Sequence, residues 1–280
     1  MCADLLNFNQ NCTHMKTLLL LFFAFLFGVH FAEAQVYVGP VAGGQLSWTK
    51  FDNRDFYNTY GIKPVWGWHA GASFSMKVRN RFFLHSSLLY STKGRTVEGK
   101  DDPLLKNKVR YNFIEAPIIY AVDFKGRMGK GKEFKFYIGV GPNVSYWLGG
   151  KGKLYNSDLA ENNEFVSQNL EYSIVFRKDL PEVQNDEMNV AEPNRIQLGL
   201  NLASGMVLEP RPDRKLLIML RYELGHSFLS RTSNGTFVPT YYQDVLQSRN
   251  KGFRLSVSYQ IDLRVEDRKR GKSTIKQKKL

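Results

Sequence analysis

The stretch FKFYIGVGPNVSYWL, residues 134–148, indicates the fold, because its residue types alternate at every second position. One set of side chains is apolar and runs from Phe134 to Leu148. The other set is mostly small or polar and includes Gly139 and Asn143. A period of two over this length predicts a β-strand with one apolar and one polar face.

The same alternation recurs in eight stretches of the chain. They span residues 36–48, 66–78, 84–90, 114–124, 134–148, 196–208, 216–224 and 253–263. Their connections alternate between long (50–64, 94–109, 149–194, 229–250) and short (79–81, 125–133, 210–215). Outer-membrane barrels have an even number of strands, short periplasmic turns and long extracellular loops. We therefore predict an all-β fold, a single eight-stranded antiparallel up-and-down transmembrane β-barrel over residues 35–263.

Two alternatives to this architecture follow from the same pattern. In a soluble barrel of the lipocalin kind the apolar face would point inward, but repeated Trp, Phe and Leu would overfill so small a lumen. Aromatic residues near the ends of the stretches also favour the membrane, where they form interfacial girdles. The second alternative concerns residues 149–194, which could form a hairpin above the membrane, plug the lumen, or add two strands to make ten.

The N-terminal segment has the pattern of an export signal. Met15 is followed by Lys16, an apolar run over 18–29 and the small residues Ala32 and Ala34, which is typical of a signal peptide with an A-x-A cleavage site. We expect cleavage after Ala34 and a true start at Met15, so that residues 1–34 form an N-terminal extension plus a signal peptide. The mature protein would then be placed in the bacterial outer membrane.

Both cysteines, Cys2 and Cys12, lie in that segment. The mature chain is therefore predicted to have no disulfide and no thiolate metal site. Its three histidines, His69, His85 and His226, fall on separate predicted strands without ligand spacing. We predict no metal site and no cofactor.

The formal charge of +13 is distributed unevenly along the chain. Residues 264–280 carry eight Lys or Arg and two acids, whereas residues 149–194 carry four Lys or Arg and nine acids. The predicted basic tail includes Arg268, Lys269, Arg270 and Lys272. It is interpreted either as a solvated run or as an attraction to anionic headgroups or an acidic periplasmic partner. A nucleic-acid partner is not favoured, because no basic surface is interleaved with stacking aromatics outside the strands.

Several charged residues fall on the polar, inward faces of the predicted strands. In a narrow barrel such charges must pair with one another. We predict a polar network in the lumen. Its candidate members are Arg221, Glu223, Arg254, Asp262, Glu115 and His85.

The inward residues also allow a catalytic interpretation of the lumen. His85, Ser87 and Glu115 lie inward on neighbouring predicted strands and could support acyl transfer as a Ser–His–acid set. Inward side chains are remote from lipid substrates, and the sequence has no nucleophile-elbow motif. We therefore predict no catalytic residue, and the lipid-modifying acyl hydrolase remains the second alternative.

The sequence YNFIEAPIIY (111–120), followed by FYIGVGP (136–142), resembles the PorT-like outer-membrane β-barrel family. The residues that carry the resemblance are Glu115, Pro117, Gly139, Gly141 and Pro142. The resemblance implies a barrel, and its namesake implies an accessory role in type IX protein secretion and gliding. The basic tail departs from barrels that end in a terminal aromatic residue.

These observations predict a non-enzymatic, structural or interaction component of the envelope. The expected partners are outer-membrane lipid and a periplasmic or secretion-system protein, and the expected oligomeric state is a monomer. A narrow pore or a small-solute-binding barrel is the first alternative.

Overall fold

The computed structural model describes residues 35–102, 104–128, 132–157, 159, 169–177, 184–211 and 213–263. The predicted signal peptide with Ala32 and Ala34, and the predicted tail with Arg268, Lys269, Arg270 and Lys272, lie outside the described residues. Among the residues described, no helix has the length and apolar character needed to cross a membrane.

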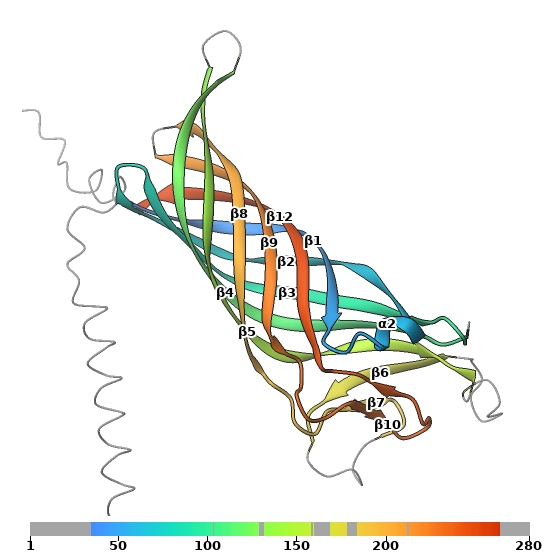
Figure 1. Ribbon diagram of the computed structural model, residues 1–280. Coiled ribbons are helices and arrows are strands. Elements are labelled where there is room, and N and C mark those ends of the chain that lie inside the picture. Colours follow the sequence, from blue (N-terminus) through green and yellow to red (C-terminus); the bar gives the residue numbers. More distant parts are fainter. Residues whose placement is uncertain are drawn as a thin grey trace, which may run out of the picture. The chain divides into compact units, whose positions relative to one another are not determined.

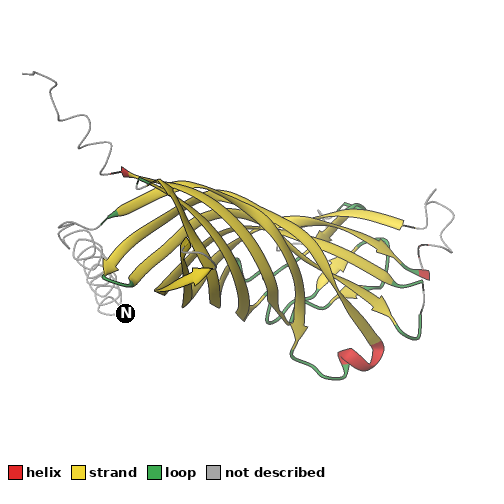
Figure 2. Ribbon diagram, turned by 90° about the horizontal axis from the view of Figure 1, so that it is seen from above, coloured by secondary structure: helices red, strands yellow, loops and turns green. Residues whose placement is uncertain are grey.

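Eight long strands form a closed ring (Figures 1 and 2). They are β1 (Val36–Phe51), β2 (Tyr60–Arg79), β3 (Phe82–Gly99), β4 (Lys106–Met128), β5 (Lys132–Tyr155), β8 (Ile196–Arg211), β9 (Arg214–Phe228) and β12 (Ser248–Asp262). Each pairs antiparallel with its neighbour in this order, β5 pairs with β8, and β12 pairs with β1 to complete the circle. The prediction of an eight-stranded antiparallel barrel is confirmed.

The remaining elements are short and lie at the end of the barrel that carries the long connections (Figure 1). They are α2 (Phe56–Thr59), β6 (Asn169–Val175), β7 (Glu187–Asn189), β10 (Gly235–Phe237) and β11 (Gln243–Asp244). Strand β6 pairs only with the outer half of β5 and with β7. In the described part of residues 149–194, the chain after the end of β5 adds no strand to the barrel and forms a hairpin with the outer half of β5 above it.

The strands are longer than the sequence pattern indicated at both ends. Strands β3 and β4 continue through most of the predicted loop 94–109, and β4 and β5 shorten the predicted turn 125–133 to residues 129–131. A tilted strand needs only about 9–11 residues to cross the hydrocarbon core. The additional residues of β4 and β5 thus extend beyond the membrane.

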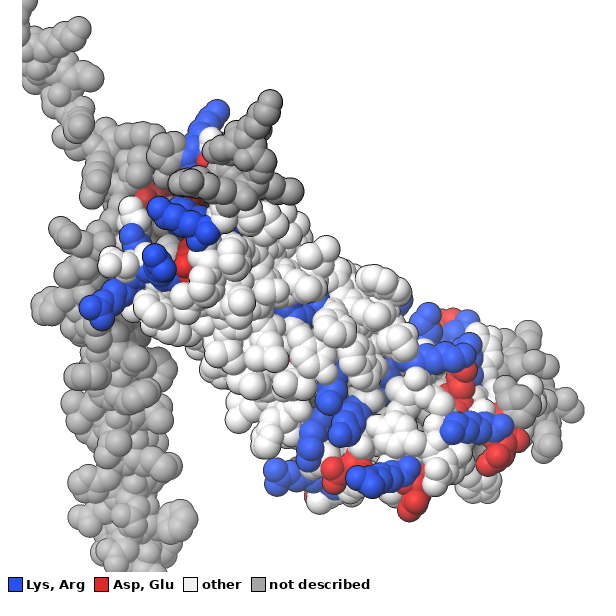
Figure 3. Space-filling view, turned by 45° about the horizontal axis from the view of Figure 1, so that its top comes forward, with Lys and Arg blue, Asp and Glu red and all other residues white. Residues whose placement is uncertain are grey.

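The face of the barrel seen in Figure 3 carries a largely uncharged band between two charged ends. Ile138, Leu198 and Leu255 are each more than half exposed in this band, which is the surface that lipid requires. Aromatic clusters lie at both ends of the band. Trp48 and Tyr222 pack with Phe253, and Phe124 stacks on Phe136.

Candidate functional site

Four charged side chains meet in the lumen at the level of the membrane. Arg254 of β12 donates to both oxygens of Glu115 on β4, with Nη2 to Oε1 at 2.8 Å, and its Nη2 lies 2.6 Å from Glu223 Oε2 on β9. The Nζ of Lys93 on β3 lies 2.6 Å from Glu115 Oε1 and also pairs with Glu223. Two cations and two anions are thus neutralised together, and all four side chains are buried.

The ring order of the strands explains why these four side chains meet. Strands β4 and β12 are four positions apart in the eight-stranded ring, and so are β3 and β9. The Glu115–Arg254 and Lys93–Glu223 pairs therefore connect opposite walls of the barrel. We call these four residues the lumen charge cluster. Each charge is shared by two partners, which offsets the large cost of removing it from water.

The predicted network and the observed cluster differ in membership. Glu115, Glu223 and Arg254 are brought together, whereas Asp262 lies eight residues further along β12 and is paired in register with Tyr37. Arg221 is buried beside Arg254 in the register of β9 and β12, but its Nε and Nη2 have no hydrogen-bond partner among the described residues.

Lys93 is the functional residue that sequence reasoning missed. The predicted stretch ends at Tyr90, and Lys93 falls between it and the predicted loop 94–109. The alternation could have identified Lys93 as an inward residue, because it continues the period of two that runs through His85, Leu89 and Ser91.

The structure does not assemble the Ser–His–acid set of the hydrolase alternative. His85 Nδ1 lies 2.7 Å from Ser75 Oγ, and its ring packs against Phe83 and Tyr137. Glu115 instead accepts a hydrogen bond from Ser91 at 2.7 Å and is occupied by the cations of the cluster. Among the described residues, no hydrogen bond joins His85 to Ser87 or to Glu115, so a proton relay through these three side chains is not formed.

Glycine and proline residues that carry the family resemblance shape strands β4 and β5 near the cluster. A Cβ on Gly141 would collide with the carbonyl oxygen of Ile118, so only glycine permits this approach of β5 to β4. A Cβ on Gly139 would lie 2.7 Å from the side chain of Ile119. Pro117 lacks an N–H donor, and the ladder between β3 and β4 is interrupted from Ser86 to Leu89, opposite it. Pro142 is paired with Leu200 of β8 and faces outward.

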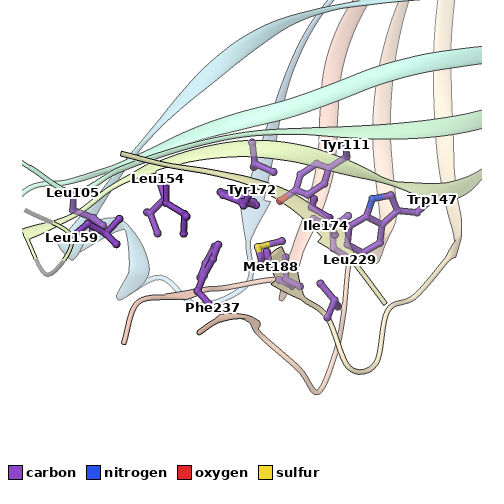
Figure 4. Close-up of a cluster of buried hydrophobic side chains, with 14 of the residues drawn as sticks. Leu105, Tyr111, Trp147, Leu154, Leu159, Tyr172, Ile174, Met188, Leu229 and Phe237 are labelled. Carbon is purple, nitrogen blue, oxygen red and sulfur yellow. The ribbon is translucent and has the colours of Figure 1, made fainter. Parts of the chain in front are cut away.

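An apolar core covers the outer mouth of the barrel (Figure 4). We call it the cap core. It consists of Leu105, Val109, Tyr111, Phe113, Trp147, Leu154, Leu159, Leu170, Tyr172, Ile174, Met188, Val190, Leu229, Phe237 and Leu246. Its members come from the outer ends of β4 and β5, from β6, β7 and β10, and from the segments around residues 190, 229 and 246.

Arg95 connects the cap to the barrel wall. It is fully buried, and its guanidinium donates to Asp244 Oδ2 at 2.9 Å, to the Val245 carbonyl at 2.8 Å and to Ser248 Oγ at 2.7 Å. Burial opposes the charge of Arg95, but the negative charge of Asp244 and its hydrogen bond to the guanidinium raise the pKa of Arg95 above its ordinary value. The segment 243–248 is thereby held against β3.

The lumen has different widths at different depths. The void below the cluster, lined by Ser73, Ser75, His85 and Arg221 among others, measures about 20 Å³, which is room for about one water molecule. The periplasmic mouth is wider, with a cavity of about 490 Å³ lined by Tyr37, Lys77, Asp123 and Lys215 among others. In the described residues, no group of three or more His, Cys, Asp or Glu side chains could hold a metal ion.

Together, the closed ring, the lipid-facing band and the polar lumen define an outer-membrane β-barrel. A family model agrees, because the outer membrane protein beta-barrel domain matches residues 18–228, about three quarters of the chain. The chain belongs to this family. The match is to the family as a whole and does not distinguish its PorT-like members.

Similar solved structures include small outer-membrane barrels of other bacteria. Neisserial surface protein A shares 11% identity, with 82% of this chain and 99% of that chain covered and a TM-score of 0.37. OprG of Pseudomonas aeruginosa shares 10% identity, with 82% and 96% covered and a TM-score of 0.43. Ail of Yersinia pestis shares 12% identity, with 81% and 99% covered and a TM-score of 0.32. A comparison with the curated proteins yields no match.

Proposed function

We propose that this protein is a non-enzymatic component of the bacterial outer membrane whose two ends, and not its lumen, make its functional contacts. The observation that carries the proposal is the lumen charge cluster, which joins opposite walls through pairs such as Glu115–Arg254. A site of this kind stabilises the barrel, and it leaves little space for a passing solute or a bound substrate.

The void below the cluster and the cap above it support this proposal over the narrow-pore alternative. The void has a volume of about 20 Å³, and the cap core covers the outer mouth with apolar side chains. Conduction of an ion would require both the cluster and the cap to move. A barrel of eight strands is in any case just wide enough for its own side chains.

The periplasmic end is the proposed protein-binding face. The short turns there carry Arg79, Arg81, Arg211 and Arg214, and the predicted tail 264–280 would follow β12 at the same end. A basic surface beside a membrane attracts anionic headgroups or an acidic protein surface. On the resemblance to the PorT-like family, we propose that the partner belongs to a secretion system, which makes the protein a secretion accessory.

Planar-bilayer recording of the purified protein tests the first part of the proposal. We expect no steady conductance from the wild type, because the cluster and the cap both block the lumen. A porin of known conductance, reconstituted in the same way, serves as the positive control. Regular single-channel steps from the wild type would replace our proposal with the narrow pore.

Cross-linking in cells tests the second part. We expect a periplasmic or secretion-system protein to be captured by the wild type and lost when residues 264–280 are deleted, with membrane insertion retained on a heat-modifiability gel. Capture that is unchanged by the deletion would contradict a role for the tail. A lipase or deacylase activity that His85→Ala abolishes would instead support the hydrolase alternative.

A further inference from the structure

Five cationic side chains form a strip on the outer face of the extended strands, above the lipid-facing band. Lys106, Lys108 and Arg110 follow one another on the outward face of β4, and Lys151 and Lys153 lie beside them on β5. We call these five residues the outer cationic strip. Lys106, Lys108, Arg110 and Lys151 are exposed and Lys153 is half-buried.

A bulge in β5 turns the lysines of that strand outward. Phe113 is paired with Trp147, but the preceding Asn112 is paired with Gly149, so Leu148 is the additional residue. Gly149 has a φ of +140°, a conformation that favours glycine. One additional residue exchanges the two faces of a strand. Lys151 therefore points outward, although Trp147, an even number of residues before it, points inward.

Register places the cations of the strip directly opposite one another. Arg110 is paired with Lys151, and Lys108 is paired with Lys153. Like charges directly opposite on one face of a sheet destabilise it. Two such pairs in succession indicate a surface that is arranged for an anion and not for the stability of the free protein.

Acidic neighbours neutralise only part of the strip. Glu98 lies 3.1 Å from Lys106, and Glu171 lies 3.0 Å from Lys153. Lys108, Arg110 and Lys151 have no acidic partner among the described residues. Three adjacent cations on two strands are thus left for an external anion.

The height of the strip matches the headgroups of the outer leaflet. Tyr90, Ile114 and Tyr146 are partners in one row across β3, β4 and β5 and mark the outer edge of the lipid-facing band. Arg110 follows four residues beyond Ile114, about 13 Å along a strand and about 9 Å above this edge at a tilt near 45°. Long cationic side chains at this height reach the interface.

We propose that Lys108, Arg110 and Lys151 bind the phosphate groups of the glycolipid in the outer leaflet, as found on the lipid A part of lipopolysaccharide. Its phosphates would neutralise the opposed cations, and its acyl chains would lie along the apolar band below Ile114. Arg and Lys both suit phosphate, Arg through a bidentate fork and Lys as a point charge. This binding goes beyond the proposed role of the periplasmic face and does not depend on it.

Native mass spectrometry of the full mature chain in detergent micelles tests the proposal, with bis-phosphorylated lipid A as the probe. The variant is Lys108→Gln/Arg110→Gln/Lys151→Gln. The matched control is Lys50→Gln/Arg54→Gln/Lys251→Gln, which removes the same charge from the outer end of β1, from the segment before α2 and from the outer end of β12. We expect at least tenfold weaker lipid A binding by the variant and less than a twofold change in the control. Heat-modifiable migration confirms that each variant is folded.

Three further results would overturn the proposal. Equal loss of binding in the variant and the control would show that only net charge matters. Equal binding of dephosphorylated lipid A, or of phosphatidylglycerol, would show that the phosphate groups of the glycolipid are not what the strip recognises. Tight binding of a soluble sulfated glycan, with no binding of lipid A, would assign the strip to an extracellular polyanion.

Discussion

Strands β4 and β5 line both the polar lumen at membrane level and the cap core above it, and the two regions have opposite chemistry. On β4 the inward residue at membrane level is Glu115, whereas above the membrane it is Val109. On β5 the inward residue changes from Asn143 to Leu154. All four side chains are buried, and only their depth relative to the lipid differs.

The difference shows that the medium outside the wall decides the chemistry inside it. At membrane level the outward face must be apolar, as at Ile138 and Ile118, so polar side chains can be placed only inside, where they satisfy one another. Above the membrane the outward face is in water and carries Lys108 and Lys151, so burial of apolar surface provides the driving force inside. One pair of strands therefore contains two inverted cores.

Removal of Glu115 is expected to have the largest effect on this arrangement. The Glu115→Ala substitution leaves Arg254 with only Glu223 and leaves a buried cation uncompensated, which typically costs about 3–5 kcal/mol. We expect urea unfolding of the micelle-bound barrel, followed by Trp fluorescence, to show a loss of this size. The control is Glu171→Gln, whose partner Lys153 is partly exposed, with a much smaller loss, because an exposed ion pair contributes little to stability. Equal losses would mean that the cluster is not a buried network.

Removal of apolar volume from the cap is expected to destabilise the cap alone. Leu154→Ala deletes a fully buried side chain from the cap core, which typically costs about 2–5 kcal/mol. Because β6 contacts the barrel through the outer half of β5, we expect faster amide exchange in residues 169–175. Exchange in residues 136–146, below the bulge, should not change. Faster exchange in both segments would contradict the separation of the two cores.

Sequence reasoning reached the barrel because the period of two persists on all eight membrane-crossing segments. It failed where the same period of two no longer places apolar residues on the outward face. Beyond the bulge at Leu148, counting every second residue from Trp147 gives the wrong face for Lys151. Above the membrane the apolar residues, such as Val109, point inward, so a search for strands with an apolar outward face assigns them to a loop. Glu115 and Arg254 were both placed in the predicted network, but their pairing was beyond reach, because it depends on which strands lie opposite one another, and that follows only from ring closure.

The cap core contains a buried hydrogen bond, and its removal is expected to have a smaller effect than the loss of apolar volume. Tyr172 Oη donates to Asn107 Oδ1 at 2.7 Å, and burial raises the pKa of Tyr172 well above its ordinary value. Tyr172→Phe keeps the ring but leaves the amide oxygen without this donor, at a cost of about 1–3 kcal/mol. We expect amide exchange to report this loss in β6. No loss would show that Asn107 finds another partner, and the substitution Tyr172→Leu then measures the contribution of the ring.

The smallest effect is expected at the rim, where Glu98 contacts Lys63 and Lys106 outside the membrane. The hydrogen bond from Lys63 and the charge of Lys106 lower the pKa of Glu98 below its ordinary value of 4.5. A carboxyl group whose pKa is lower in the folded than in the unfolded state stabilises the protein when the pH is above its unfolded-state pKa. This stabilisation disappears as the pH falls through the folded-state pKa. Glu98→Gln should therefore lose at most about 1 kcal/mol at pH 7 and nothing at a pH below both pKa values. Urea unfolding at the two pH values checks this difference, and a larger loss at the lower pH would show that Glu98 acts through a contact other than these lysines.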